Sequence, residues 1–76
     1  MTIDEAVRAR IKELLAQNHM TVSKLALSVG MTPSTLYSYL SNESGHIQLN
    51  TLGQICEGFK ITLSEFFDKD YFQSEE

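Results

Sequence analysis

Seventy-six residues are enough for one domain with a small hydrophobic core, and too few for that core and a deep catalytic cleft together. Hydrophobic residues make up 42% of the chain, which indicates a packed globule rather than a disordered segment. A single cysteine excludes an internal disulfide, and no apolar run reaches the length of a membrane-spanning helix. The first residues are acidic where a secretion signal is basic, so we expect one cytoplasmic domain over residues 1–76, without membrane contact.

The formal net charge of −4 is confined to the C-terminal part of the chain. Residues 1–56 carry four acidic and four basic side chains, whereas residues 57–76 carry six acidic and two basic ones. An acidic surface repels the phosphates of a nucleic acid. We therefore do not expect the last twenty residues to face a phosphate backbone.

Apolar side chains at helical spacing near the N-terminus predict an amphipathic helix over residues 3–18. Thr2 and Glu5 have the spacing of a capping box at its start, and Asn18 and His19 end it. The apolar face consists of Val7, Ile11, Leu14 and Leu15. The basic residues are expected on the outer face, either as ordinary solvated charges or beside phosphates, and they are Arg8, Arg10 and Lys12.

Two shorter helices joined by a tight turn are predicted between residues 21 and 41. Thr21 caps the first, which ends at Gly30 because glycine readily adopts the left-handed conformation that closes a helix. Thr32 and Pro33 begin the second, since a proline at the first helical position has no N–H to leave unpaired. The pair has the form of a helix-turn-helix.

A fourth helix is predicted over about residues 49–59, and a short fifth helix follows Thr62. The N-cap of the fourth helix is left open between Gln48 and Asn50, while Thr62 and Glu65 form a second capping box. The apolar face of the fourth helix consists of Leu52, Ile55, Cys56 and Phe59. No alternating pattern persists long enough for a strand, so the fold class is all-α.

The two predicted helices around Gly30 resemble the helix-turn-helix of the Xre/Cro (phage-repressor-type) family. In that family a Leu-Ala pair is followed by glycine four residues after the alanine, then by an aliphatic residue and a Ser/Thr cap. The matching residues here are Leu25, Ala26, Gly30, Met31 and Thr32. The segment from Leu52 to Phe67 resembles the closing helices of the same family, so the resemblance covers roughly residues 8–67.

This resemblance implies a five-helix phage-repressor-like DNA-binding domain and a regulatory function. The recognition helix, about residues 33–41, would lie in the major groove of double-stranded DNA. Family members generally bind two half-sites as dimers, so a repressor-like homodimer that controls transcription is expected.

The chain departs from the family pattern at three positions. Val22 stands where members commonly carry a glutamine that reaches a phosphate, so only the backbone N–H of Val22 is left for that contact. Leu15 and Leu40 stand where many members hold a buried arginine–glutamate pair. An apolar pair avoids the desolvation of two charges, and we expect these two leucines to meet in the core.

The helical phase of residues 33–41 separates a core face from an outer face. Leu36, Tyr39 and Leu40 should face the core, which leaves Tyr37 and two serines outside. Serine discriminates poorly between bases, so apolar contacts and DNA shape are expected to contribute to specificity. The predicted DNA-binding residues are Val22, Lys24, Thr32, Pro33, Ser34, Thr35, Tyr37, Ser38 and Asn42.

The remaining reactive side chains suggest no catalysis. His19 and His46 lie far apart with no cysteine or carboxylate at ligand spacing, so no metal site is expected. Cys56 falls at a core position and is expected to be a buried, unreactive thiol. No nucleophile–base pair or phosphate-binding loop can be assembled, so we predict neither an enzyme nor a cofactor.

The C-terminal region holds four aromatic side chains between residues 66 and 72, more than so small a core needs, and they include two in the tail over residues 68–76. Phe66 is expected in the core, and surplus apolar surface at a chain end often marks an interface. Phe67, Tyr71 and Phe72 are therefore candidates for a dimer contact, with simple packing over the fourth helix as the alternative.

Two functions remain open at this point. The first is a sequence-specific DNA-binding regulator. The second is a protein-interaction module that has kept the fold and lost DNA binding, which the net acidity, Val22 and the uncharged outer face of residues 33–41 favour. The electrostatic potential around that face separates the two.

Overall fold

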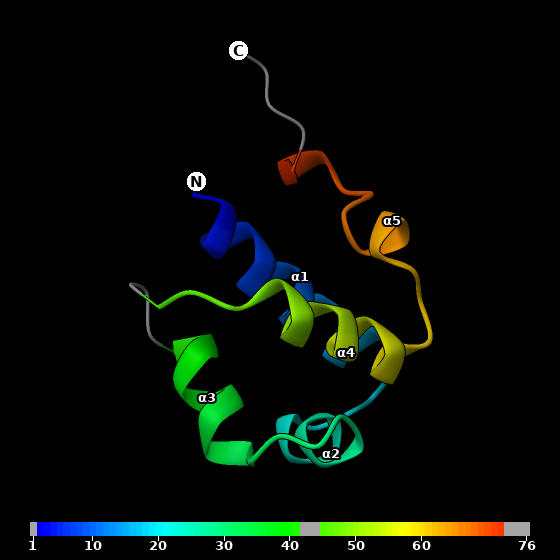
Figure 1. The fold of residues 1–76 in the computed structure, drawn as a ribbon. Helices are drawn as coiled ribbons and strands as arrows, with labels where there is room; N and C mark the ends of the chain where they lie inside the picture. Colours follow the sequence, from blue (N-terminus) through cyan, green and yellow to red (C-terminus); the bar gives the residue numbers. More distant parts are fainter. Residues whose placement is uncertain (1, 42–44, 73–76) are drawn as a thin grey trace.

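The computed structural model describes residues 2–41 and 45–72, and all regular structure within these ranges is helical (Figure 1). The α-helices are α1 (Ile3–Gln17), α2 (Val22–Ser28), α3 (Pro33–Ser41), α4 (Leu49–Phe59) and α5 (Leu63–Phe66), and a 3₁₀ turn, η1 (Asp70–Phe72), follows them. The predicted five-helix, all-α architecture is confirmed. Over the described residues, no helix combines the length and apolarity needed to cross a membrane.

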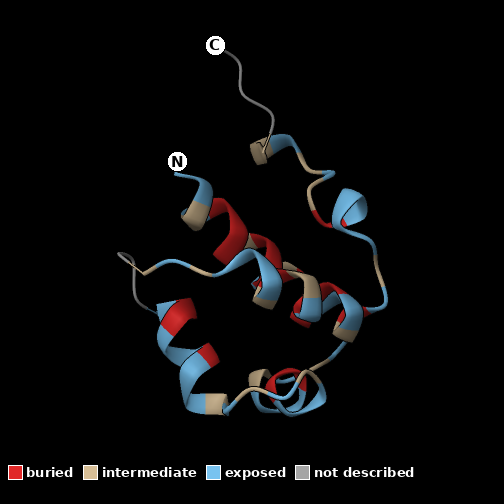
Figure 2. Cartoon of the chain, viewed as in Figure 1, coloured by how far each residue is buried: buried red, intermediate tan, exposed pale blue. Residues whose placement is uncertain are grey.

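The helices surround one core, with α2 and α3 at one end of the molecule and α5 and η1 at the other (Figure 1). Helix α1 contacts both α3 and η1, while α4 contacts α2 and α5. The buried positions follow the sides of the helices that face one another (Figure 2). The largest side chains removed from solvent are Ile11, Leu25, Leu36, Ile55 and Phe66.

Both predicted capping boxes are present. The Thr2 hydroxyl accepts from the Glu5 N–H at 3.1 Å, and the Glu5 carboxylate accepts from the Thr2 N–H at 2.7 Å. Thr62 and Glu65 repeat this arrangement at the start of α5. These bonds occupy N–H groups that the first turn of a helix cannot pair internally.

The structure resolves the open question of which residue is the N-cap of α4. Gln48 is the N-cap and its side chain makes no capping bond, while Asn50 lies inside the helix. The better capping chemistry of asparagine is therefore not used, because the backbone turns into the helix two residues earlier.

The turn between α2 and α3 closes with paired backbone bonds around Gly30. Its φ is +76°, and the Met31 N–H donates to the Ala26 carbonyl at 2.8 Å. The Gly30 N–H bonds the Leu27 carbonyl, which completes a Schellman motif. The glycine predicted at this turn thus has the left-handed conformation that the motif requires.

Two of the three basic residues expected on the outer face of α1 are buried, and that expectation was wrong. Arg10 is 8% exposed, and its guanidinium donates to the carbonyls of Phe66 at 2.7 Å and Glu65 at 2.9 Å. These carbonyls lie at the C-terminal end of α5, where helical carbonyls have no partner and a positive charge is favourable. Arg10 therefore fastens α5 to α1.

Arg8 does the same for α3. It is 5% exposed, donates through Nε to the Tyr39 carbonyl at 2.8 Å, and donates through Nη2 to the Gly45 carbonyl. Its guanidinium carbon lies 4.7 Å from the centroid of the Tyr39 ring, a distance at which a cation and an aromatic face attract. Arg8 and Arg10 are thus structural residues of the core, and of the three only Lys12 is exposed.

Helices α2 and α4 approach closely at Gly58. A Cβ on Gly58 would lie 2.9 Å from Val29 Cγ1 and 3.0 Å from Leu25 Cδ1, closer than carbon atoms normally approach. Gly53 lies in the same helix, and a Cβ there would meet nothing within 4 Å. A glycine-to-alanine substitution therefore adds a methyl group to a crowded site at Gly58 and to an open site at Gly53.

We predict that Gly58→Ala destabilises the protein by about 1–3 kcal/mol, because the new methyl forces apart side chains that are already packed. Gly53→Ala is the control and should stabilise the protein by about 0.5–1 kcal/mol, since alanine restricts the unfolded chain and favours helix. Urea unfolding of the two variants beside the original chain measures both. Equal stabilisation by both alanines would contradict the close approach of α2 and α4.

Candidate nucleic-acid interface

The outer face of α3 has the polarity that its helical phase predicts. Leu36, Tyr39 and Leu40 are buried, and Pro33 is half-buried at the first turn. Tyr37 is 56% exposed, so most of its ring is available to a partner. The other exposed side chains of this face all carry hydroxyls, and they are Ser34, Thr35 and Ser38.

At the start of α3, two hydroxyls pair with each other. Thr32 Oγ1 lies 2.6 Å from Thr35 Oγ1, and both residues are exposed. A hydroxyl that donates to its neighbour still offers lone pairs, and the neighbour still offers its proton. The pair therefore presents one donor and several acceptors at the N-terminal end of α3.

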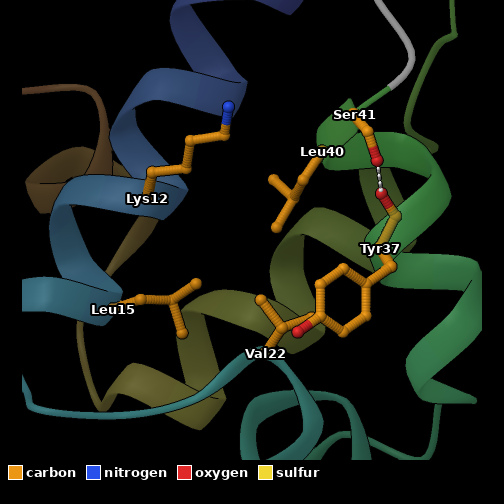
Figure 3. Close-up of a pocket in the computed structure, with 6 residues that line it drawn as sticks. All are labelled: Lys12, Leu15, Val22, Tyr37, Leu40 and Ser41. Carbon is orange, nitrogen blue, oxygen red and sulfur yellow. Dashed lines mark hydrogen bonds between the residues drawn. The ribbon is translucent and has the colours of Figure 1, made fainter.

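Beside α3 lies a groove of about 370 Å³ between α1, α2 and α3 (Figure 3). Leu15 and Leu40 point into it from opposite sides, and the Tyr37 ring lies at its edge with the hydroxyl towards Val22 (Figure 3). The groove is lined by Lys12, Leu15, Val22, Tyr37, Leu40 and Ser41. Leu15 and Leu40 are both buried, as the sequence predicted, and they face each other across this groove.

The DNA-binding residues predicted from the sequence left out two residues of this groove, Lys12 and Ser41, although Lys12 was among the basic residues expected as solvated charges or beside phosphates. Lys12 precedes Leu15 by one helical turn, which places both on the same side of α1. That spacing is the signal that could have found it. Ser41 is the last residue of α3, and its hydroxyl donates to the Tyr37 carbonyl.

The predicted DNA-binding residues gather around α3 with few charges. Val22 is half-buried at the first turn of α2, and Lys24 is exposed on the same helix. Asn42 lies outside the described residues. Lys12 and Lys24 are the exposed cations on α1–α3, and no carboxylate lines the groove within the described part of the chain.

The C-terminal end of α3 is tied to the start of α1 through Asp4. The Tyr39 hydroxyl donates to Asp4 Oδ1 at 2.9 Å, and His46 Nδ1 lies 2.6 Å from Asp4 Oδ2. Hydrogen bonding from His46 is the main cause that lowers the pKa of Asp4; desolvation opposes it, and the bond from Tyr39 lowers the pKa further. Burial, together with the bond to this carboxylate, raises the pKa of Tyr39, so the phenol stays a donor.

The aromatic tail packs against α1 rather than over α4. The Tyr71 hydroxyl donates to Glu13 Oε1 at 3.0 Å, and Lys69 Nζ lies 3.0 Å from Glu13 Oε2. The Lys69 bond is the main cause that lowers the pKa of Glu13. The Phe67 and Phe72 ring centroids are 4.8 Å apart in an edge-to-face arrangement. These three aromatic residues are half-buried within one chain, which leaves part of each ring exposed.

Cys56 lies in the core, where the sequence placed it. It is 2% exposed, and burial raises the pKa of its thiol. A thiol that resists ionisation is a poor nucleophile. The thiol therefore acts as a small apolar side chain.

Two comparisons with known proteins give a match, one to a protein family and one to a solved structure. The family model of the Cro/C1-type helix-turn-helix DNA-binding domain matches residues 10–69. The crystal structure of the prophage Lp1 protein 11 superimposes with a TM-score of 0.83, at 24% sequence identity, over 97% of each chain. At that identity the likeness establishes the fold. A comparison with curated proteins finds no match.

The Asp4 contacts predict a loss of stability in acid. A carboxylate whose pKa is lowered by folding stabilises the protein above its ordinary value of 3.8, and that contribution disappears as the pH falls through the folded-state pKa. The free energy of unfolding of Asp4→Asn should therefore fall below that of the original chain at pH 6, and the difference should shrink towards about pH 2.

Urea unfolding at several pH values measures this difference. Asp68→Asn, at an exposed position of the tail, is the matched control and should leave the curve unchanged. A difference between Asp4→Asn and the original chain that stays constant from neutral pH to acid would contradict the role of Asp4.

Proposed function

The chain belongs to the Cro/C1-type helix-turn-helix DNA-binding domains, and we propose that it is a sequence-specific transcriptional regulator that acts in a repressor-like manner in the cytoplasm. The observation that carries this proposal is the match of residues 10–69 to that DNA-binding domain. The outer face of α3 is compatible with it, because it presents hydroxyls and one large ring with no carboxylate from Pro33 to Ser41. A face of this kind can enter the major groove without repelling phosphates. We infer no enzymatic activity.

In this proposal α3 lies in the major groove and its side chains divide the contacts. Ser34 and Ser38 lie one helical turn apart, so their hydroxyls can reach neighbouring base edges. The Tyr37 ring contacts a thymine methyl or a sugar. Lys24 and the Val22 N–H approach the phosphates beside the groove. The remaining proposed contacts, at the two ends of α3, come from Thr32, Pro33, Thr35 and Asn42.

This surface favours readout of DNA shape over strong hydrogen bonding to bases. Serine and threonine hydroxyls donate or accept, and no arginine or glutamine is present on α3 for a bidentate contact. Few cations also release few counterions, so the affinity should depend weakly on salt. A sequence-dependent groove width or bend then contributes a large share of the specificity.

The alternative function is a protein-interaction module with the same fold. The burial of Arg8 and Arg10 favours it, because those charges are withdrawn from the surface. The acidic residues of the C-terminal quarter favour it as well. The exposed lysines beside α3, Lys12 and Lys24, favour DNA, because a phosphate backbone is attracted to such cations.

The DNA proposal predicts specific effects of three substitutions. Selection of duplexes from a random pool should yield a preferred sequence, bound with a log–log salt slope of about −3 to −5 per pair of subunits. Ser34→Ala and Ser38→Ala should relax the base preference, and Tyr37→Ala should weaken binding by about 1–3 kcal/mol. Fluorescence anisotropy on selected and scrambled duplexes measures both effects.

Gln54→Ala is the control, because Gln54 is exposed on α4, away from α3. It should bind as the original chain does. Absence of binding to any duplex at low salt would refute the DNA proposal and support the interaction module. Binding with unchanged preference in all three variants would place the reading surface elsewhere.

We further propose that the protein binds DNA as a homodimer through the tail. Half-sites about 34–36 Å apart require two recognition helices related by two-fold symmetry. The exposed parts of Phe67, Tyr71 and Phe72 supply apolar surface at the end of the fold away from α3. The acidic residues near them keep this end away from phosphates.

Sedimentation of the full chain at about 50 μM should show a dimer. Phe72→Ser should shift it towards monomer and weaken binding to a duplex with two half-sites, because the second site is no longer tethered. Leu27→Ser is the control, since Leu27 is an exposed apolar residue on α2. A monomer at that concentration would rule out the tail as a dimer contact.

A further inference from the structure

Of the three basic residues on α1, only Lys12 is free to meet a partner. The guanidinium groups of Arg8 and Arg10 donate hydrogen bonds to carbonyls near the ends of α3 and α5. Lys12 is exposed and makes no ion pair among the described residues. It comes from a helix outside the helix-turn-helix, yet it borders the surface that α3 presents.

Lys12 extends along the groove between α1 and α3 (Figure 3). Its ammonium group lies on the side of the groove where Leu40 and Ser41 end α3. The wall beneath is apolar, with Leu15 and Val22 on the far side. An ammonium beside an apolar wall is only partly hydrated and attracts an anion more strongly than it would in open solvent.

Lys12 borders a second hollow as well as the groove. An adjoining hollow of about 310 Å³ is lined by Lys12 together with Glu5 and Arg8. Glu5 is already used, since its carboxylate accepts from the Thr2 N–H in the capping box. Arg8 adds a positive charge just below the surface, and its Nη1 has no hydrogen-bond partner. Asp4 is close enough to Arg8 for the two charges to attract, so Lys12 is the exposed cation that remains at this hollow.

We propose that Lys12 binds a backbone phosphate of the duplex, on the flank of the recognition helix. This inference rests on the proposed function and assigns a DNA contact to α1. A side chain that reaches α3 from its flank, rather than from its outer face, meets the strand that borders the major groove and not the base edges. A flexible ammonium suits a phosphate, which accepts from any direction.

The contact also compensates for a feature of α2. Val22 offers no side-chain donor to a phosphate at the first turn of that helix. Lys12 lines the same groove as Val22, so it restores a charged contact on that side of α3. An acidic side chain of a protein partner would also bind the Lys12 ammonium group. The experiment below distinguishes such a partner from a DNA phosphate.

The test compares Lys12→Met with the original chain on a selected and a scrambled duplex across a salt series. Methionine keeps the apolar stem against the groove and removes the charge. Binding to both duplexes should weaken by the same factor, about 5–10-fold at low salt, and the log–log salt slope should become shallower by about 1 per subunit. Lys12→Arg should retain both the affinity and the slope.

Lys60→Asn is the matched control, because it removes one positive charge at the far end of α4, on the opposite side of the molecule from α3 (Figure 1). Asparagine tolerates the left-handed conformation of this residue, whose φ is +61°. This variant should bind as the original chain does. Thermal unfolding checks that each variant folds, and Lys12→Gln supplies the measurement if Lys12→Met does not.

Each outcome is informative. An original chain that binds DNA while Lys12→Met keeps its affinity and slope overturns the phosphate contact and leaves the proposed function standing. A change of base preference in Lys12→Met overturns it as well, since it would assign Lys12 to a base. An original chain that binds no duplex overturns the proposed function and this contact together.

Discussion

The structure depends on two arginines of α1 that complete the ends of other helices. The last carbonyls of a helix have no partner of their own, and a short helix has few bonds to spare. Arg8 satisfies a carbonyl near the end of α3 and the carbonyl of Gly45, while Arg10 satisfies two near the end of α5. Both guanidinium groups are buried, so each charge is compensated by bonds to carbonyl dipoles and, at Arg10, by the 3.0 Å ion pair with Glu13. The position of α3 relative to α1 follows from the first of these sets.

This use of arginine also determines the character of the outer surface. A charge that is buried to hold α3 in place is lost to the attraction of phosphates, so the helix is positioned at the expense of electrostatic affinity. Lys12 and Lys24 are left beside hydroxyls and a tyrosine ring. A regulator built this way gains little from non-specific binding, because that binding is almost wholly electrostatic. In the proposed function, a preference for one DNA site over another therefore rests on the complementarity of shape between α3 and the groove.

The sequence predicted what is encoded over a few residues and failed where the partner is distant. Capping boxes, the left-handed Gly30 and the phase of α3 depend on residues within two helical turns, and they were predicted. The partners of Arg8 and Arg10 are backbone carbonyls 31 and 56 residues away. Every residue has a backbone carbonyl, so the sequence does not indicate which one an arginine will bind. An arginine on the polar side of a helix therefore resembles a solvated charge until the fold is known.

Two other helices end where the sequence predicted, but the left-handed residue that closes each of them was not predicted. His19 and Lys60 adopt the left-handed conformation with φ of +52° and +61°. The following N–H groups donate back to Leu15 and Cys56, as at Gly30. Without glycine the sequence gives no signal for a left-handed closure, because that conformation costs a residue with a side chain about 1 kcal/mol.

The groove beside α3 shows how a change in the core reaches the surface. Leu15 and Leu40 occupy the positions where the family resemblance places a buried ion pair. An ion pair spans such a space with long side chains that hydrogen-bond to each other, whereas two leucines leave an apolar hollow of about 370 Å³. The leucines avoid the desolvation of two charges, and in return the site loses a rigid polar contact between α1 and α3. The bonds of Arg8 and Asp4 to Tyr39, the residue before Leu40, make that connection instead. An apolar pair at Leu15 and Leu40 is therefore compatible with a fixed position of α3, because the hydrogen bonds of Tyr39 with Arg8 and Asp4 connect α3 to α1 independently of that pair.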